Sequence, residues 1–365
     1  MKKILIVLIA LLFLSLFAYV QKPSFTPNEV GQQANEVGPK RIIGFLPYWQ
    51  VGTVSESKLK VLTDVFFFGV HFDEKGALAA NDIKRLDGVS FTTLVLILQE
   101  NEKIEQFLAD QKAWDTFVEE VVPLIDTYTL EGINIDVEYS GIPAKITING
   151  FTEFMSYMTR RLKETNPSVV ISVDTTADSI RKSRLYDVEN IAKEVDYIIL
   201  MGYDFYRPGS SVAGPIAPLF GKEIYDYDVS SAIEDFLKVV PKEKLILGVA
   251  YYGWDFPTAS DERGSFTEER PDESVALATY KRTRKLLEEG KVTAHFDEDS
   301  QTPWMTYKDE TSGDVRQIWF EDAISLGKKY DFINEKRLAG VAIWALGYDG
   351  DYPQLNSLLE EKFPR

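Results

Sequence analysis

The stretch EGINIDVEYS, from Glu131 to Ser140, alternates polar and apolar side chains in a chain otherwise rich in isoleucine, valine and phenylalanine. Successive side chains of a β-strand point to opposite faces, so Asn134, Asp136 and Glu138 share one face and the apolar residues share the other. Burying a carboxylate is costly unless it is paired or used in chemistry. The alternation therefore predicts a strand that carries a functional site.

Seven other short runs rich in β-branched and aromatic residues occur along the chain, separated by amphipathic stretches. Near-continuous apolar runs are typical of parallel strands that are buried on both faces. The intervening stretches have apolar residues at helical spacing, as in AWDTFVEEVVPLIDTY and GFTEFMSYMTRRLKETNP. The eight runs are RIIGFLPYW (41–49), DVFFFGVHF (64–72), TTLVLILQE (92–100), GINIDVE (132–138), SVVISVD (168–174), VDYIILMGYD (195–204), KLILGVAYYG (244–253) and LAGVAIWALG (338–347). Eight alternations of strand and helix predict an α/β fold, the (β/α)8 TIM barrel.

The gap between the seventh and eighth runs is too long for a single helix. Its excess, residues 254–317, contains a helix-like segment, ALATYKRTRKLLEEG, and two strand-like segments, KVTAHFD and PWMTYKD. This pattern predicts a small α+β insertion on the C-terminal rim of the barrel, between strand 7 and the last helix. We therefore expect one catalytic barrel over residues 41–365 that contains the insertion.

The first 20 residues, MKKILIVLIALLFLSLFAYV, place two lysines before an unbroken apolar run, which is the layout of an export signal. The small-residue pattern of a cleavage site is poor, so a cleaved signal peptide and an uncleaved membrane anchor both fit. Residues 21–40 contain proline, asparagine, glutamine and glycine, and we expect them to form a linker. The protein is therefore expected to be exported, either secreted or anchored on the outer side of the cytoplasmic membrane.

The composition excludes several classes of function. The formal net charge is −17, so the surface should repel nucleic acid and anionic membranes, and neutral or cationic partners fit better. The absence of cysteine excludes disulfides, thiolate zinc sites and a cysteine nucleophile. Only two histidines are present and no GxSxG motif accompanies them, which excludes a three-histidine zinc site and gives no indication of a serine triad. We expect a monomer without metal or other cofactor, whose chemistry is carried by carboxylates and tyrosines.

In a barrel, the apolar face of the strand at residues 132–138 must contact the outer helices, so its polar face points into the barrel. Glu138 then lies outermost, at the mouth where such barrels carry their active sites, and Asp136 lies one layer deeper. Two neighbouring carboxylates in a partly dry site disfavour double ionisation, so one should hold a proton near neutral pH and serve as a general acid. The alternative is an internal polar cluster that only satisfies its own hydrogen bonds.

The segment EGINIDVE resembles the DGxDxDxE signature of glycoside hydrolase family 18, the chitinase-like enzymes, with Glu131 and Asn134 in place of two aspartates. Three further motifs resemble those of the family, in the same order along the predicted strands. They are MGYD (201–204) at the end of strand six, VAYYG (249–253) at the end of strand seven and AIWALG (342–347) on strand eight. The resemblance covers essentially residue 41 to the C-terminus, and it implies a TIM barrel that hydrolyses a polysaccharide containing N-acetylglucosamine.

The resemblance also implies a role for each matching residue. Glu138 matches the acid that protonates the glycosidic oxygen, while the acetamido oxygen of the substrate's own N-acetyl sugar attacks the anomeric carbon in place of an enzyme nucleophile. Asp136 matches the residue that holds the acetamido N–H, and Tyr203 matches the hydroxyl that donates to the acetamido oxygen. Asp204 matches a sugar contact beside them, and Trp344 matches the aromatic floor under the reacting ring.

Other residues of the predicted rim are candidates for substrate binding, although each has a simpler structural interpretation. Aromatic side chains there either stack on sugars or pack the barrel against the insertion. Because Asn134 removes the innermost carboxylate of the signature, we expect Asp136 to ionise more readily. Asp174, at the end of strand five, either contacts sugar or caps the next turn. The remaining substrate-binding candidates are Asn134, Met201, Tyr48, Trp49, Tyr206 and Trp254.

The leading hypothesis is a retaining glycosidase that cleaves β-1,4 bonds next to N-acetylglucosamine in chitin-type oligosaccharides or peptidoglycan. The runs YDFYRPGSSVAGPIAPL and QIWFEDAISLGKKYDF look more like the bacterial spore-cortex and cell-wall-lytic branch of the family than like secreted chitin degraders. The end of strand three, LILQEN, lacks the Ser-x-Gly-Gly stretch of the family and has no assigned role. The competing hypothesis is a catalytically silent glycan-binding protein on the same barrel. A glycosidase with its own nucleophile would need a second carboxylate about 5 Å from the acid across the sugar.

Overall fold

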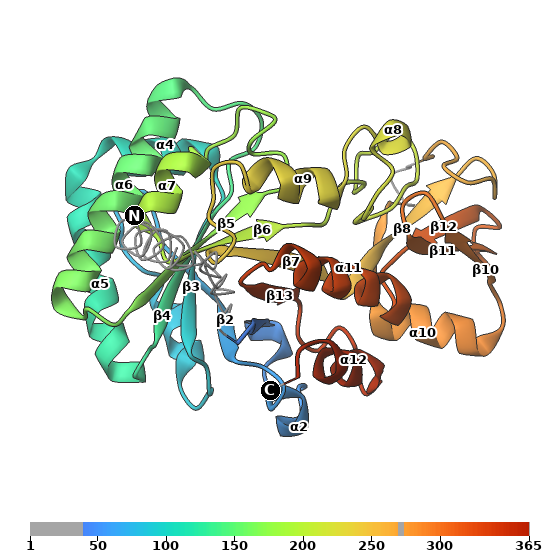
Figure 1. The fold of residues 1–365 in the computed structure, drawn as a ribbon, viewed down its shortest axis with the longest axis horizontal. Helices are drawn as coiled ribbons and strands as arrows, with labels where there is room; N and C mark the ends of the chain where they lie inside the picture. Colours follow the sequence, from blue (N-terminus) through green and yellow to red (C-terminus); the bar gives the residue numbers. More distant parts are fainter. Residues whose placement is uncertain (1–38, 269–273, 365) are drawn as a thin grey trace, which may run out of the picture. The chain divides into compact units, whose positions relative to one another are not determined.

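The computed structural model describes residues 39–268 and 274–364, in which eight parallel strands close into a barrel (Figure 1). Around the barrel the strands follow the order β1-β13-β7-β6-β5-β4-β3-β2. Their bounds are β1 (Arg41–Pro47), β2 (Asp64–His71), β3 (Thr93–Leu98), β4 (Gly132–Val137), β5 (Val170–Thr176), β6 (Tyr197–Met201), β7 (Leu245–Ala250) and β13 (Gly340–Trp344). Each strand coincides with one of the eight apolar runs, which confirms the predicted (β/α)8 barrel.

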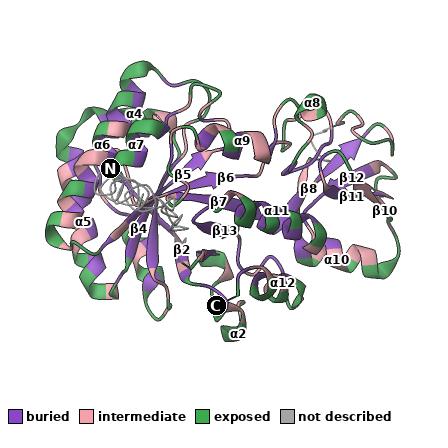
Figure 2. Cartoon of the chain, viewed as in Figure 1, coloured by how far each residue is buried: buried purple, intermediate pink, exposed green. Residues whose placement is uncertain are grey.

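Helices connect the strands and pack their buried faces against the outer surface of the barrel (Figure 2). In helix α5 the apolar residues recur at helical spacing, and the Asp110 side chain caps the N-terminus by accepting a hydrogen bond from the Lys112 N–H. The helical segments are η1 (Tyr48–Gln50), α2 (Glu56–Leu59), α3 (Ala80–Ile83), η2 (Lys84–Leu86), α4 (Asn101–Ala109), α5 (Gln111–Tyr128), α6 (Lys145–Thr165), α7 (Val188–Glu194), α8 (Lys222–Tyr225), α9 (Val229–Phe236), α10 (Tyr280–Glu289), α11 (Ala323–Lys336) and α12 (Gln354–Lys362).

Because the barrel strands are buried on both faces, apolar residues form a core on each side of them. Outside the strands, aromatic rings of α4 and α6 meet, with the Phe107 and Phe154 centroids 4.8 Å apart. Inside the barrel, a smaller apolar cluster comprises Ile43, Phe45, Phe66, Val95, Ile97, Ile199, Ile246, Ala339 and Ala342. The buried polar side chains of β4 and β5 are Asn134, Asp136, Ser172, Asp174 and Thr175.

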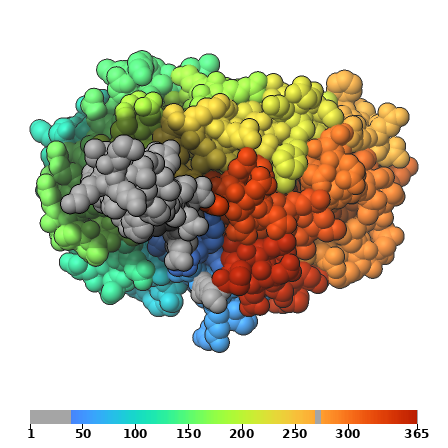
Figure 3. Space-filling view, in the orientation of Figure 1, coloured from blue at the N-terminus to red at the C-terminus, as the bar shows by residue number. Residues whose placement is uncertain are grey.

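An antiparallel sheet is formed between β7 and β13 in the sequence, where the apolar pattern predicts an insertion. The strands pair in the order β10-β11-β12-β8-β9, and α10 follows β9. They are β8 (Tyr252–Thr258), β9 (Ala276–Thr279), β10 (Thr293–Asp297), β11 (Thr302–Lys308) and β12 (Val315–Trp319). In Figure 3 this segment, in orange, continues the surface formed by the yellow and red segments of the chain. Inside it, Trp319 is fully buried and stacks on Trp304 with ring centroids 5.1 Å apart.

The predicted export signal, residues 1–20, and all of the predicted linker except its last two residues lie outside the described residues. Among the residues that the structure does describe, no helix combines the length and the apolar character needed to span a bilayer.

Candidate active site

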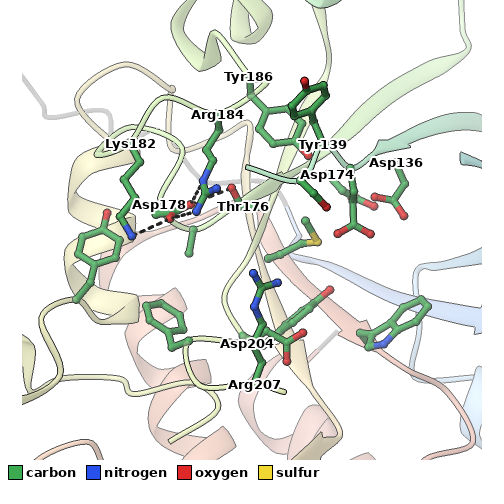
Figure 4. Close-up of a pocket in the computed structure, with 18 of the residues that line it drawn as sticks. Asp136, Tyr139, Asp174, Thr176, Asp178, Lys182, Arg184, Tyr186, Asp204 and Arg207 are labelled. Atoms are coloured by element: carbon green, nitrogen blue, oxygen red, sulfur yellow. Dashed lines mark hydrogen bonds and ion pairs between the residues drawn. The ribbon is translucent and has the colours of Figure 1, made fainter. Parts of the chain in front are cut away.

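A cavity of about 680 Å³ opens at the C-terminal ends of the barrel strands (Figure 4). The ends of β4, β5 and β6 and the loops after them supply most of its lining, at the position where barrels of this fold carry active sites. The predicted site residues that line it are Asp136, Glu138, Asp174, Met201, Tyr203, Asp204, Tyr206 and Trp344. The predicted residues that are not part of the lining are Asn134, Tyr48, Trp49 and Trp254.

Strand β4 presents its polar residues to the barrel interior, as its alternation predicts. The solvent accessibility of these side chains increases toward the mouth: Asn134 and Asp136 are buried, and Glu138 is half-buried. Glu138 Oε1 accepts a 3.0 Å hydrogen bond from Gln99 Nε2, at the end of β3. The end of β3, to which the sequence assigned no role, therefore orients the carboxylate at the mouth.

The two lining carboxyl groups of this segment hold protons more tightly than free carboxyl groups do. Burial raises the pKa of Asp136 well above its usual value, and the neighbouring Glu138 and Asp174 carboxylates raise it further. Burial also raises the pKa of Glu138, although the hydrogen bond from Gln99 opposes that shift. Neighbouring carboxyl groups with raised pKa values can keep a proton available at neutral pH, which general acid catalysis requires.

Asp174, on the neighbouring strand β5, corrects one expectation from the sequence. Asn134 Nδ2 donates hydrogen bonds to Ser172 Oγ at 3.0 Å and to Asp174 Oδ1 at 3.1 Å. Burial raises the pKa of Asp174 to about 8, although the hydrogen bond from Asn134 opposes the shift. The expectation that Asp136 ionises more readily assumed that no other buried carboxyl group is near, but β5 supplies Asp174, which raises the pKa of Asp136 further.

Two buried oxygens of β4, Asn134 Oδ1 and Asp136 Oδ1, have no hydrogen-bond donor among the described residues. A buried acceptor without a donor costs about 1–3 kcal/mol. Because Asp136 also lines the cavity, a donor group of a bound ligand can supply the missing hydrogen bond. An amide N–H that projects from a ligand into the barrel has the required chemistry.

Asp204 follows β6 with a positive φ of 60°, a backbone conformation that is uncommon for residues other than glycine. Its Oδ1 accepts hydrogen bonds of 2.8 Å from the Tyr252 hydroxyl and from Trp254 Nε1. Burial raises the pKa of Asp204, and these two hydrogen bonds oppose the shift. Trp254 therefore orients Asp204 from outside the lining, and the structure does not place it as a stacking platform.

Tyr203 precedes Asp204 and lines the cavity as a neutral hydroxyl. Burial raises the pKa of Tyr203 well above 10, and the surrounding carboxylates raise it further, so the phenol keeps its proton at neutral pH. A Cβ atom on Gly248 of β7 would lie 3.3 Å from Tyr203 Cε1, so the glycine leaves room for the ring. The site therefore holds a hydroxyl donor next to the buried carboxyl groups.

Trp344, at the end of β13, forms an aromatic wall of the cavity together with Phe45 and Phe68. Its ring centroid lies 4.6 Å from that of Phe68, with the two planes at 74°. Tyr48 and Trp49 of η1 are 36% and 45% exposed, respectively. The ring of Trp49 packs edge-on against Trp344 at 6.3 Å, so η1 supports this wall from outside the lining.

The sequence analysis missed several charged residues of the lining, which lie on the loops after β5 and β6. Asp178, Lys182 and Arg184 come from the first loop, and Arg207 comes from the second. No strand alternation marks these positions, and although Arg207 lies in the run YDFYRPGSSVAGPIAPL, that run does not show where its side chain points. Within the described ranges, no group of three or more metal-ligating side chains is positioned to hold a metal ion.

The raised pKa of Asp174 predicts that stability depends on pH. Its pKa is about 8 in the folded chain and about 3.9 when unfolded, so only the folded state holds this proton between those values. The free energy of unfolding therefore falls as pH rises from about 4 to about 8. We expect Asp174→Asn to raise the Tm at pH 8, by about 2–4 °C for each kcal/mol recovered, and to change it little at pH 4.

Thermal unfolding at both pH values tests this prediction, with Asp178→Asn as the matched control. Burial raises the pKa of Asp178, but the hydrogen bond and charge of Arg184 outweigh burial and lower it overall. The control should therefore lower the Tm at pH 8. An equal loss of Tm in Asp174→Asn at both pH values would contradict the assigned protonation.

Comparison with known proteins identifies relatives of this chain. The chain is 26% identical over 249 residues to the putative sporulation-specific glycosylase YdhD of Bacillus subtilis, a match that covers 67% of this chain but only about half, 54%, of that protein. It is 26% identical over 318 residues to the probable di-N-acetylchitobiase 2 of Dictyostelium discoideum, which covers 82% of this chain and 78% of that protein.

The crystal structure of the spore cortex-lytic enzyme SleL of Bacillus megaterium QM B1551 has the same fold, with a TM-score of 0.73 at 22% identity over 89% of this chain and 74% of that chain. The family described as glycosyl hydrolases family 18 matches residues 41–349, which include all eight barrel strands and the insertion. Because this match covers most of the chain, the protein belongs to glycosyl hydrolases family 18.

Proposed function

We propose that this protein is a retaining glycoside hydrolase that cleaves β-1,4 bonds next to N-acetylglucosamine by substrate-assisted catalysis. The observation that carries the proposal is the buried Asp136 Oδ1, which lines the cavity without a donor beside the half-buried Glu138. An acetamido N–H of a bound sugar supplies that donor. Relatives described as a sporulation-specific glycosylase and a di-N-acetylchitobiase support glycans that contain N-acetylglucosamine.

The first step uses the proton on Glu138. The carboxyl group donates it to the glycosidic oxygen as the acetamido oxygen attacks the anomeric carbon, so the C–O bond to the leaving sugar breaks and an oxazolinium ion forms. The Asp136 carboxylate accepts a hydrogen bond from the acetamido N–H and offsets the positive charge of the ring. The neutral hydroxyl of Tyr203 donates to the acetamido oxygen and orients it for attack.

The second step restores the enzyme. Glu138, now a carboxylate, accepts a proton from water while the water oxygen attacks the anomeric carbon and the oxazolinium ring opens. Two displacements at the same carbon retain the configuration of the sugar. The wall of Trp344 and Phe68 gives the pyranose ring an apolar face to stack on throughout.

Hydrolysis of two substrates side by side tests the proposal, with products identified by mass spectrometry. Chitin oligomers and purified peptidoglycan are incubated with the wild type and with Glu138→Gln. Cleavage of peptidoglycan alone would place the protein in wall remodelling, and cleavage of chitin oligomers alone would make it a chitinase. Failure of the wild type on both substrates would contradict the proposal and favour the silent glycan-binding alternative.

The mechanism has its own test. A thiazoline analogue of the oxazolinium ion should inhibit competitively, and proton NMR should detect the β-anomer as the first product. Insensitivity to the thiazoline would favour a glycosidase with its own nucleophile. Because cell-wall glycan lies outside the cytoplasmic membrane, we also propose that the protein is exported.

A further inference from the structure

The charges that line the cavity are unbalanced. Its described lining contains six carboxyl groups, Asp136, Glu138, Asp174, Asp178, Asp204 and Asp226, and three cationic side chains, Lys182, Arg184 and Arg207. A cavity of this kind repels an anionic ligand unless one of its cations is available to bind it. The partners of the three cations therefore decide which glycans the site accepts.

Two of the three cations are already paired with the same carboxylate. Arg184 donates to Asp178 through Nη2 at 2.6 Å and through Nε at 2.9 Å. Lys182 Nζ lies 3.4 Å from Asp178 Oδ2. Figure 4 shows these contacts on the β5 side of the cavity. Both of these cations therefore already have a carboxylate partner within the protein.

Arg207 differs from both. It is exposed, and its guanidinium makes no ion pair or hydrogen bond within the part of the chain that the structure describes, although its backbone N–H donates to Ser210 Oγ at 3.0 Å. Figure 4 shows its side chain beside Asp204, extending into the cavity. A guanidinium presents several donors in a planar fork that matches a carboxylate.

Arg207 lines the same cavity as Glu138 and Asp136, on the loop after β6 that also carries Asp204. Its charge acts to lower the pKa values of Glu138 and Asp204, but it is not among the main influences on the pKa values of the deeper Asp136 and Asp174. These effects agree with the exposure of the two residues, because the exposed Arg207 and the half-buried Glu138 both line the accessible part of the cavity, whereas Asp136 and Asp174 are buried. In the proposed mechanism Glu138 donates its proton to the oxygen between the reacting sugar and the leaving sugar, so a flexible cation in the accessible part of the same cavity is available to the sugar that leaves.

We propose that Arg207 binds a carboxylate on the leaving sugar and selects a glycan in which lactyl-substituted sugars alternate with N-acetylglucosamine. This inference rests on the proposed function and specifies its substrate class. A polymer of N-acetylglucosamine alone carries no carboxylate and leaves the guanidinium unpaired. The inference departs from the expectation that neutral or cationic partners fit better, because that expectation rests on the net charge of the whole chain, and exposed charges farther away than about 8 Å are screened at physiological salt.

The experiment compares kcat/KM on three soluble substrates: a neutral N-acetylglucosamine tetramer, a peptide-free peptidoglycan glycan with lactyl carboxylates, and the same glycan as its methyl ester. Arg207→Gln should lower the ratio of the second to the first about 10- to 100-fold, the range of a charge-assisted hydrogen bond. Arg207→Lys should lower it less, because an ammonium keeps the charge without the fork. Esterification should reduce wild-type activity similarly and add little to Arg207→Gln.

The ratio separates recognition from an effect on the acid, because any change in Glu138 acts on all three substrates and cancels. Arg181→Gln is the matched control, since Arg181 is an arginine of the loop after β5 that already pairs with Asp226 at 2.7 Å and is not part of the lining. It should leave the ratio within about twofold. An equal loss on charged and neutral substrates in Arg207→Gln would overturn the inference while the proposed function stands.

If the wild type hydrolyses neither glycan, calorimetric measurement of glycan binding still tests the role of Arg207 separately from the proposed hydrolysis. Binding of the charged glycan that weakens on esterification and in Arg207→Gln would support the inference, although the proposed hydrolysis would have failed. A binding affinity that changes neither on esterification nor in Arg207→Gln would overturn the inference. Hydrolysis of the neutral tetramer in preference to the charged glycan would also overturn it, while the glycosidase proposal would remain.

Discussion

Glu138→Gln lowers the turnover number for glycan cleavage by about 10²- to 10⁴-fold, the contribution of a positioned general acid. The substitution keeps the shape of the side chain and leaves a carbonyl oxygen to accept the 3.0 Å hydrogen bond that Gln99 Nε2 donates to Glu138 Oε1. It removes the proton that the leaving oxygen needs. Because that proton transfer occurs only in the transition state, kcat and kcat/KM should fall together.

Steady-state kinetics on a chitin oligomer or a peptidoglycan glycan measures this loss. Glu100→Gln is the matched control, because Glu100 is an exposed carboxylate directly after Gln99 that pairs with Lys103 at 2.6 Å. The control should keep kcat within about twofold, since exposed pairs contribute little. Retention of wild-type turnover by Glu138→Gln would remove Glu138 from the mechanism.

The barrel was predictable because its strands are recognised by composition within short windows. The apolar run at residues 93–98 and the alternation at residues 132–137 each show which faces are buried, without knowledge of any partner strand. The order of Asn134, Asp136 and Glu138 from the interior to the mouth follows from the same period-two rule. These inferences depend on local geometry, which the sequence contains.

The cross-strand contacts of the site were not predictable, because they depend on register. Asn134 pairs with Ser172 in the register of β4 and β5, and this register brings Asp174 within reach of its amide. A shift of one residue would have turned Asp174 away from the barrel interior. The missing innermost carboxylate could therefore be seen in the sequence, but its replacement from β5 could not.

The roles of site residues on loops were even harder to predict from the sequence. From its place near the rim, Trp254 was expected either to stack on a sugar or to pack the barrel against the insertion, yet its indole N–H donates to Asp204 at 2.8 Å. Arg207 lies three residues after Asp204 in a loop without periodicity, so no pattern indicates where its guanidinium points. Side-chain direction on a loop depends on the fold around it, and site residues on loops are the ones that sequence patterns miss.

Asp136→Asn is expected to lower kcat by about 10²- to 10³-fold, the size of the loss when one preorganised electrostatic contact to the reacting group is removed. The carboxylate both orients the acetamido group and offsets the charge of the oxazolinium ion. An amide can still accept the N–H, but it carries no charge to stabilise the ion. KM should therefore change less than kcat.

The same substitution should leave the Tm at pH 8 equal or higher. Burial holds the pKa of Asp136 well above its unfolded value, so the folded state loses stability as pH rises past about 3.9 toward the folded pKa. Removing the carboxyl group removes that loss. A variant that is more stable and less active would show that the chain keeps a costly buried acid for chemistry. If Asp136→Asn instead lowered the Tm and retained most activity, the carboxyl groups of β4 would be an internal polar cluster, and their place at the barrel mouth would serve the fold alone.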